Sequence, residues 1–373
     1  MTVLIVPDSF KETLSAIQVG SIIAKEFAVR RPDYKSIVLP LSDGGEGFID
    51  TFLHLGDGYR VPVQARDPLN RPITASYGVN IGAGEAIIEI AASSGLHLLK
   101  SSERNPFYTS SYGTGLVIRA ALEAGFRKFI VGLGGSATND AGVGMLQALG
   151  MRFLDRNGRD VRAGGIYLAD ICDIDTDNFS PSVGYSEFQI ACDVTNVLVG
   201  PDGASMIYGP QKGGSVEMCR LLDQNLAFFA SVVESKTGIN PAIAKSGGAA
   251  GGLGAAFMAF FPSEICSGIE MIVKYAALDQ KIKQADLIIT GEGRFDNQSR
   301  NGKLVSGILK LTEKYNKRVL VVAGRIEKEA IGCARSDEDY ISLEQNAGTM
   351  QRAMAEPEYW LARTIGAWIE KRL

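Results

Sequence analysis

The sequence has few histidines, and their placement excludes the commonest metal chemistry. Among its 373 residues only His54 and His97 are histidines, and neither has a partner at metal-binding spacing. Zinc enzymes normally use several His or Cys ligands. Neither a zinc centre nor a His-dependent triad is therefore predicted, and any chemistry must rest on carboxylates, lysines, hydroxyls and the backbone.

Cysteine pairs, long apolar runs and excess positive charge are also missing. The five cysteines are scattered without a Cys-x-x-Cys pair, so neither a zinc knuckle nor a disulfide framework is indicated. No uncharged apolar run reaches the roughly 18 residues of a membrane-spanning helix. The net charge of -4 gives no basic footprint for nucleic acid. We expect a cytoplasmic protein, a monomer or homodimer, that binds neither nucleic acid nor membrane.

Glycine, in contrast, is abundant. The 43 glycines cluster in SDGGEG, GLGGSATNDAGVG, GPQKGG, GGAAGGLG and TGEGRFD. Glycine at such places permits positive φ and a close approach of backbone to ligand, although tight turns of an α/β fold explain part of the number. These segments are the candidate ligand-binding loops.

The two ends of the chain share one pattern. Apolar runs that predict buried strands alternate with segments of helical periodicity, which is typical of a parallel sheet. Near the N-terminus the predicted strands are 2–7 and 35–45 and the helices 15–31 and 46–55; near the C-terminus the predicted strands are 285–293, 318–324 and 339–343.

The middle of the chain has a different pattern. Short β-runs split by turns over residues 59–95 predict an antiparallel meander. We therefore predict an α/β protein in which both chain ends, 1–58 and 268–373, form a Rossmann-like parallel sheet domain. A second, mixed α/β domain is inserted at 59–267. Ligands usually bind in the cleft between such domains, so we expect the active site there.

Polar residues follow three of the predicted strands. Asp8, Ser9 and Lys11 lie at the end of the first strand, Asp43 at the end of the second, and the segment TGEGRFD at the end of a late one. In an open parallel sheet, ligands gather beyond the carboxyl ends of the strands. Asp8 and Asp43 could instead be helix N-caps. Three strands that bring such residues to one edge nevertheless predict a ligand site.

The glycine loop at 132–144 allows more than one function. Gly132-x-Gly134-x-x-Ala137 after a strand matches the dinucleotide fingerprint, which gives the alternative of an NAD(P)-dependent reductase of a small hydroxy acid. The acidic partner would be Asp155, but Asp155 lies in a D-R-N-G turn. This alternative leaves SDGGEG, GPQKGG and TGEGRFD unexplained. A non-catalytic protein that binds small anions is a second alternative.

Seven motifs, in order along the chain, resemble those of the type I glycerate kinases, the bacterial glycerate 2-kinase family. PDSFKETLSA resembles the family's PDSFKGSLSA, LSDGGEG its ADGGEG, and GLGGSATNDAGVGMLQALG its GIGGSATNDGGAGMLQALG. SYGTG, ACDVTNVLVGPDGAS with GPQKGG, GGAAGGLG and ITGEGRFDNQSRNGK also have counterparts there. Glu12 replaces a Gly and Val197 a Pro, but no polar motif residue is lost.

This resemblance implies a phosphotransferase. The γ-phosphoryl group of ATP would move to a hydroxyl of D-glycerate, and the family favours 2-phosphoglycerate over 3-phosphoglycerate as the product. Such a transfer needs Mg²⁺, donors around the phosphates and a carboxylate near the nucleophile. ATP and Mg²⁺ are thus the expected cofactors, and D-glycerate is the expected partner.

The resemblance and the motifs together assign roles to individual residues. Asp193 is preferred as the base because it follows a strand that looks buried, where a desolvated carboxylate is suited to accept a proton; Asp43 is the alternative. The lysines could instead be surface residues. The full assignment is Asp193, Asp43 and Lys11 as catalytic; Gly134, Gly135, Ser136, Thr138, Asn139, Thr290, Gly291, Glu292, Gly293 and Lys303 as phosphate- or nucleotide-binding; Asp8, Ser9, Arg66, Arg71, Arg104 and Lys212 as substrate-binding; and Asp140 and Glu292 as metal ligands.

Overall fold

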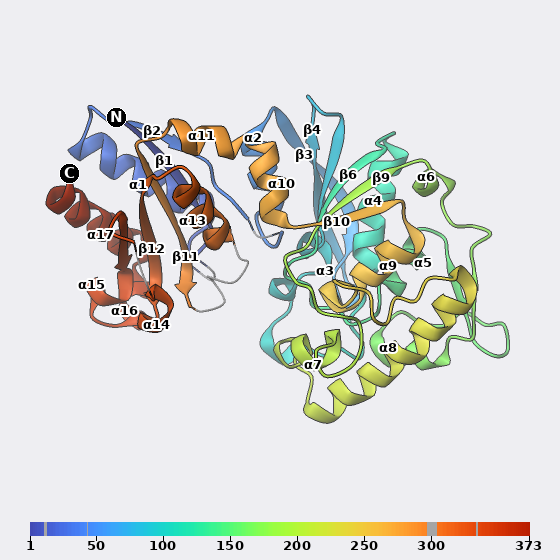
Figure 1. Cartoon of the computed structure of the whole chain (residues 1–373). Coiled ribbons are helices and arrows are strands. Elements are labelled where there is room, and N and C mark those ends of the chain that lie inside the picture. Colours follow the sequence, from blue (N-terminus) through green and yellow to red (C-terminus); the bar gives the residue numbers. More distant parts are fainter. Residues whose placement is uncertain (11–12, 43, 297–303, 333–334) are drawn as a thin grey trace. The chain divides into compact units, whose positions relative to one another are not determined.

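The computed structural model describes residues 1–10, 13–42, 44–296, 304–332 and 335–373 (Figure 1). The chain divides into two compact units. The terminal unit consists of Met1–Asp43 and Gly268–Leu373, and the inserted unit of Gly44–Ser267. The predicted α/β fold, with a parallel sheet built from both chain ends and a mixed α/β insertion, is confirmed.

The terminal unit is built on a five-stranded parallel sheet of order β13-β12-β11-β1-β2. β1 lies inside the sheet, between β11 and β2, and is apolar along its length because both of its faces are covered. Its last residue, Pro7, is in register with Gly291 of β11. The strands are β1 (Thr2–Pro7), β2 (Lys35–Val38), β11 (Leu287–Phe295), β12 (Arg318–Ile326) and β13 (Glu338–Ser342).

Helices cover both faces of this sheet. Alternate residues of the strands pack into two separate cores, one formed with α1 and α17 and the other with α13. Ser15 is the N-cap of α1, since its hydroxyl accepts from the Gln18 backbone N–H at 3.3 Å. Residues 268–284 form two helices rather than one, because Ala277 between them has φ 46°. The helices are α1 (Ala16–Arg30), α10 (Gly268–Tyr275), α11 (Leu278–Gln284), α13 (Leu304–Lys314), α14 (Lys328–Ile331), α15 (Leu343–Ala347), α16 (Met350–Ala355) and α17 (Pro357–Arg372).

The inserted unit is built on a six-stranded mixed sheet of order β10-β9-β6-β5-β4-β3. The predicted meander corresponds to β3, β4 and β5, which pair antiparallel. β5, β6, β9 and β10 then pair in parallel, so the ends of these four strands meet at one edge. The strands are β3 (Gly58–Arg66), β4 (Pro72–Asn80), β5 (Glu85–Glu89), β6 (Lys128–Gly132), β9 (Glu187–Ala191) and β10 (Ser263–Cys266), with β7 (Arg152–Leu154) and β8 (Asp173–Asp175) as a separate pair.

The boundary between the two units differs from the predicted one because of helix α2. It packs against β4 and β5 and buries Phe48, Ile49 and Phe52, so it belongs to the inserted unit. The structure therefore divides at residue 43 rather than at the predicted residue 58. The helices of this unit are α2 (Phe48–Leu55), α3 (Ala91–Ser94), α4 (Tyr112–Glu123), α5 (Val143–Ala148), α6 (Pro181–Gly184), α7 (Ala204–Tyr208), α8 (Val216–Thr237) and α9 (Leu253–Phe260), with 3₁₀ turns at Leu96–Leu98, Ser101–Glu103, Gly165–Asp170, Pro210–Lys212 and Ala249–Gly251.

Candidate active site

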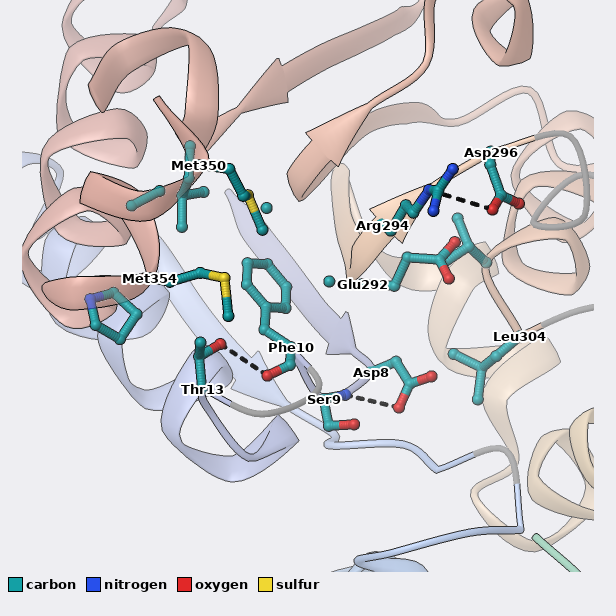
Figure 2. A pocket seen from close by; sticks show the side chains of 16 residues that line it. Asp8, Ser9, Phe10, Thr13, Glu292, Arg294, Asp296, Leu304, Met350 and Met354 are labelled. Carbon is teal, nitrogen blue, oxygen red and sulfur yellow. Dashed lines mark hydrogen bonds and ion pairs between the residues drawn. The ribbon is translucent and has the colours of Figure 1, made fainter. Parts of the chain in front are cut away.

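A cavity of about 460 Å³ lies in the terminal unit, beyond the carboxyl end of β1 and along the last residues of β11 (Figure 2). This is the sheet edge at which the sequence predicts a ligand. Its polar lining includes the predicted residues Asp8, Ser9, Glu292 and Gly293. The remaining lining residues are Phe10, Thr13, Arg294, Asp296, Leu304, Val305, Gly324, Leu343, Met350, Ala353, Met354 and Pro357.

Two carboxylates mark the polar side of this cavity. Asp8 is 8% and Glu292 9% exposed. They follow Pro7 and Gly291, which pair across β1 and β11, so the two residues occupy corresponding positions on adjacent strands. One or two carboxylates plus substrate phosphates is the usual donor set of Mg²⁺. Within the described residues no group of three or more His, Cys, Asp or Glu side chains could hold a metal ion without such help.

The other predicted residues of this segment have structural roles. The Thr290 hydroxyl is fully buried and donates to the Val6 carbonyl oxygen at 3.0 Å. Gly291 lies inside β11, paired with both β1 and β12. The backbone at Gly291 therefore takes part in sheet pairing, and its predicted role in phosphate binding stays a prediction. Arg294 is paired with Asp296 and Glu327.

In the inserted unit, a buried lysine, Lys212, binds the loop between β6 and α5. Lys212 is 2% exposed, and its Nζ donates to the Thr138 carbonyl oxygen at 2.7 Å. Burial lowers the pKa of Lys212 to about 8, while the charge of Asp140 acts in the opposite direction. Gly213, the next residue, packs on Arg104, because a Cβ atom there would lie 2.3 Å from the Arg104 carbonyl oxygen.

Asp140 organises this loop from inside. It is fully buried, and its Oδ2 accepts from the Ser111 N–H and hydroxyl at 2.8 and 2.9 Å and from the Gly144 N–H at 3.3 Å. Its Oδ1 accepts from the Gly142 N–H at 3.2 Å. Burial raises the pKa of Asp140 against the effect of these donors. The carboxylate is thus enclosed by the loop, a geometry that disfavours its predicted role as a metal ligand.

Most of the predicted phosphate donors at 134–138 bind within the chain. The Gly134 N–H donates to the Gly44 carbonyl oxygen at 2.8 Å, and the Ala137 N–H to the Ser94 carbonyl oxygen at 2.8 Å. The Thr138 N–H donates to the Ser136 hydroxyl at 3.1 Å. Gly135, which is exposed and has φ 71°, is the position of this loop most open to a ligand. Asn139 is buried and bonded to Ser205, which gives it a packing role.

The predicted base lies where β9 and β10 end. Asp193 is half-buried, two residues after β9, and its Oδ1 accepts from the Ser267 hydroxyl at 2.8 Å. Ser267 directly follows β10, the parallel neighbour of β9. The same sheet pairing therefore positions both members of the hydrogen bond.

The three predicted arginines have different surroundings. Arg71 is paired with Asp67 and Glu103 at 2.5 and 2.7 Å, so its guanidinium is already neutralised. Arg66 is exposed and donates to the Asn70 carbonyl oxygen. The Nε of Arg104, in contrast, is buried and has no hydrogen-bond partner among the described residues. Arg104 is therefore the arginine best placed to take a carboxylate. Lys11, Asp43 and Lys303 lie outside the described residues.

Comparisons with known proteins identify the family. Residues 3–370 match the model of the glycerate kinase family. The chain belongs to the glycerate kinase family. It is 42% identical over 326 residues to a glycerate 2-kinase of Escherichia coli K12, covering 87% of this chain and 86% of that protein. It is 39% identical over 332 residues to a glycerate kinase of Bacillus subtilis 168, covering 88% and 86%.

A solved structure agrees with the family. The crystal structure of a protein assigned as glycerate kinase 2 in Salmonella typhimurium LT2 superimposes with a TM-score of 0.80 at 37% sequence identity, covering 100% of this chain and 98% of that one. The resemblance found in the sequence motifs is thus confirmed. The reductase alternative is wrong, since a kinase family accounts for almost the whole chain.

Sequence reasoning missed Glu89 at the end of β5. It is 6% exposed, and its two carboxylate oxygens accept from the backbone N–H groups of Gly47 and Ile49 at 3.3 and 3.1 Å, where α2 begins. Burial raises the pKa of Glu89 to about 7. The run EAIIE, an apolar strand that ends in a carboxylate, was the available signal. Over the residues that the structure describes, no helix has the length and apolarity to cross a membrane.

Proposed function

We propose that this glycerate kinase family member transfers the γ-phosphoryl group of ATP to the 2-hydroxyl of D-glycerate, giving ADP and 2-phosphoglycerate. The observation that carries the proposal is the match to the family over residues 3–370, with a relative called glycerate 2-kinase at 42% identity. We further propose that the enzyme works in the cytoplasm. We propose a monomer or a homodimer as its assembly.

We assign Mg²⁺ to Asp8 and Glu292. Both are nearly buried carboxylates at one sheet edge, and both line a cavity large enough for a nucleotide. When bound, the ion would neutralise the phosphate oxygens. Asp140 has no such access, because its oxygens face the donors of Ser111 and of its own loop. In the proposal, Asp8 therefore replaces Asp140 as the partner of Glu292.

Asp193 is the proposed general base. The glycerate hydroxyl oxygen forms the new bond to phosphorus, the bond from phosphorus to the ADP oxygen breaks, and the hydroxyl proton passes to Asp193. The Ser267 hydroxyl donates to Oδ1 of Asp193 and so fixes the orientation of the carboxylate. A positioned base of this kind contributes roughly 10²–10⁴-fold to the rate.

Arg104 and Lys212 are the proposed ligands of anionic groups. Arg104 has a buried Nε without a partner in the described part of the chain. Lys212 has three donor hydrogens, of which the bond to Thr138 uses one. A guanidinium holds a carboxylate through two parallel hydrogen bonds, so Arg104 suits the glycerate carboxylate. Gly135 and Ser136 remain the proposed phosphate contacts of the glycine loop.

A coupled assay tests the function. Purified protein with ATP and Mg²⁺ should release ADP only when D-glycerate is added, and EDTA should stop the reaction. Phosphorus and proton NMR of the product would distinguish 2-phosphoglycerate from 3-phosphoglycerate. ADP release without glycerate dependence, or turnover with a different hydroxy acid only, would contradict the proposal.

A further inference from the structure

The cavity of the terminal unit has two chemically different sides. Figure 2 shows Asp8, Glu292 and Asp296 on one side, and Met350 and Met354 with Phe10 on the other. Five more apolar residues without charge line the cavity, and one of them, Leu304, lies on the side of Asp8 and Glu292 in Figure 2. They are Leu304, Val305, Leu343, Ala353 and Pro357.

The apolar side is built by ordered elements. Met350 and Met354 are one helical turn apart on α16, so both side chains reach the same cavity. Thr349 caps this helix, its hydroxyl accepting from the Arg352 N–H at 3.3 Å. Met350 also lies over β12, since a Cβ on Gly324 would come within 3.5 Å of its Cε.

Phe10 is fixed as well. The Thr13 hydroxyl donates to the Phe10 carbonyl oxygen at 2.8 Å, and the Phe10 N–H donates to Leu14 at 2.8 Å. Met354 remains 40% exposed although it is a large apolar residue. An apolar wall with an open methionine is the kind of surface that a flat ring covers, because the thioether is polarizable and packs well on aromatic rings.

The two substrates of the proposed reaction differ in the contacts that they could make with the apolar side of the cavity. Every carbon of glycerate carries oxygen, so the molecule has no apolar face to bury against methionine, leucine and proline. Glycerate is also an anion, and the cavity would repel it because three carboxylates line the cavity. The arginine of the lining, Arg294, is already paired with Asp296 and Glu327. A purine ring has a large apolar face, and its nucleotide brings Mg²⁺ with its phosphates.

We propose that Met350, Met354 and Phe10 seat the purine ring of the nucleotide, with the phosphates extending toward Asp8 and Glu292. This inference rests on the proposed function for the choice of ATP. It adds a base-binding site on α16, a helix outside all of the sequence motifs. It also makes the cavity the nucleotide site of the terminal unit rather than a glycerate site.

Tryptophan fluorescence can report ligand binding at this site. Its two tryptophans, Trp360 and Trp368, both lie on α17, whose first residue Pro357 lines the cavity. Adenosine is the decisive probe, because it has the base but neither phosphate nor charge. Titration of the native protein with adenosine, in the absence of Mg²⁺, should change tryptophan fluorescence saturably.

Met354→Asp is the test variant and Gln351→Asp is the control. Both put one carboxylate on the same helix, but Gln351 is exposed and does not line the cavity. Met354→Asp should weaken adenosine and ADP binding by about tenfold or more, because a purine then meets a charge that needs water. The glycerate KM should change by less than about threefold, and Gln351→Asp should match the native protein in both respects.

Three results would overturn the inference. A higher glycerate KM in Met354→Asp with unchanged adenosine binding would make the cavity a glycerate site. Equal adenosine affinity in native protein and Met354→Asp, or no adenosine binding to the native protein, would place the base elsewhere. The proposed function fails separately, by an absence of glycerate-dependent ADP release from the native protein while adenosine still binds. Circular dichroism of both variants verifies that the protein as a whole remains folded.

Discussion

The ammonium nitrogen of Lys212 and the carbonyl oxygen of Thr138 are 2.7 Å apart in the interior of the inserted unit. A charged amine in such a place is costly, which is why the pKa of Lys212 falls to about 8. The amine connects the GPQKGG segment to the GGSATND loop. Burial of a charged amine that joins two candidate ligand-binding loops points to a role in function.

The first prediction follows from this contact. Lys212→Met keeps the length of the side chain and removes the charge. We expect kcat/KM to fall by about 100-fold or more, since one charge contact in a transition state is commonly worth that much. The melting temperature at pH 7 should not fall, because the folded state no longer has to bury an ammonium group. Lys236→Met, at an exposed position, is the control; an unstable but fully active Lys212→Met would reverse the assignment.

Glu89 gives a prediction about pH. Its pKa is about 7 in the folded protein against an ordinary 4.5, so the folded state binds the proton more tightly than the unfolded state. The contribution of Glu89 to stability therefore decreases as pH rises from 4.5 to 7 and is lowest above that window. The whole change is on the order of 3 kcal/mol.

Glu89→Gln removes this titration. The difference in melting temperature between native protein and variant should change between pH 5 and pH 8, with the native protein relatively more stable at pH 5. Glu123→Gln, at an exposed position, should show no such dependence. Parallel pH profiles for native protein and Glu89→Gln would mean that Glu89 titrates as an ordinary surface carboxylate.

Asp193 and Ser267 give a paired prediction. Asp193→Asn should lower kcat by roughly 10²–10⁴-fold and leave the glycerate KM within a few-fold, as expected for a base. Ser267→Ala should lower kcat by about tenfold, and Ser267→Thr, which keeps the hydroxyl, should recover most of it. If added Mg²⁺ restores the rate of Asp193→Asn, Asp193 is a metal ligand instead.

Arg104 is tested against Arg66. Arg104→Gln should raise the glycerate KM by about tenfold or more, the usual value of a hydrogen bond to a charged group. Arg66→Gln should leave it nearly unchanged, because that side chain is exposed and bonded to Asn70. Steady-state kinetics at saturating ATP would measure both, and equal effects would remove the distinction between the two arginines.

The sequence predicted the sheet edge well because apolar strand runs and their trailing carboxylates are local features. Asp8 and Glu292 accordingly line one cavity. It could not predict that Thr290 and Asp140 turn inward, since this depends on partners such as Val6 and Ser111 that are distant in sequence. The place of α2 was missed for the same reason, because its apolar face fits either sheet until β4 and β5 are in place.

The bond from the Gly134 N–H to the Gly44 carbonyl oxygen also limits how this protein can evolve. A Cβ atom on Gly134 would lie 2.5 Å from the backbone nitrogen of Gly45, and one on Gly132 would lie 2.5 Å from the Gly44 carbonyl oxygen. Neither segment can gain a side chain there unless the other backbone moves away. The SDGGEG and GLGGSATND segments are thus coupled in their tolerance of substitution. Replacement of a glycine in one segment requires the backbone of the other segment to move.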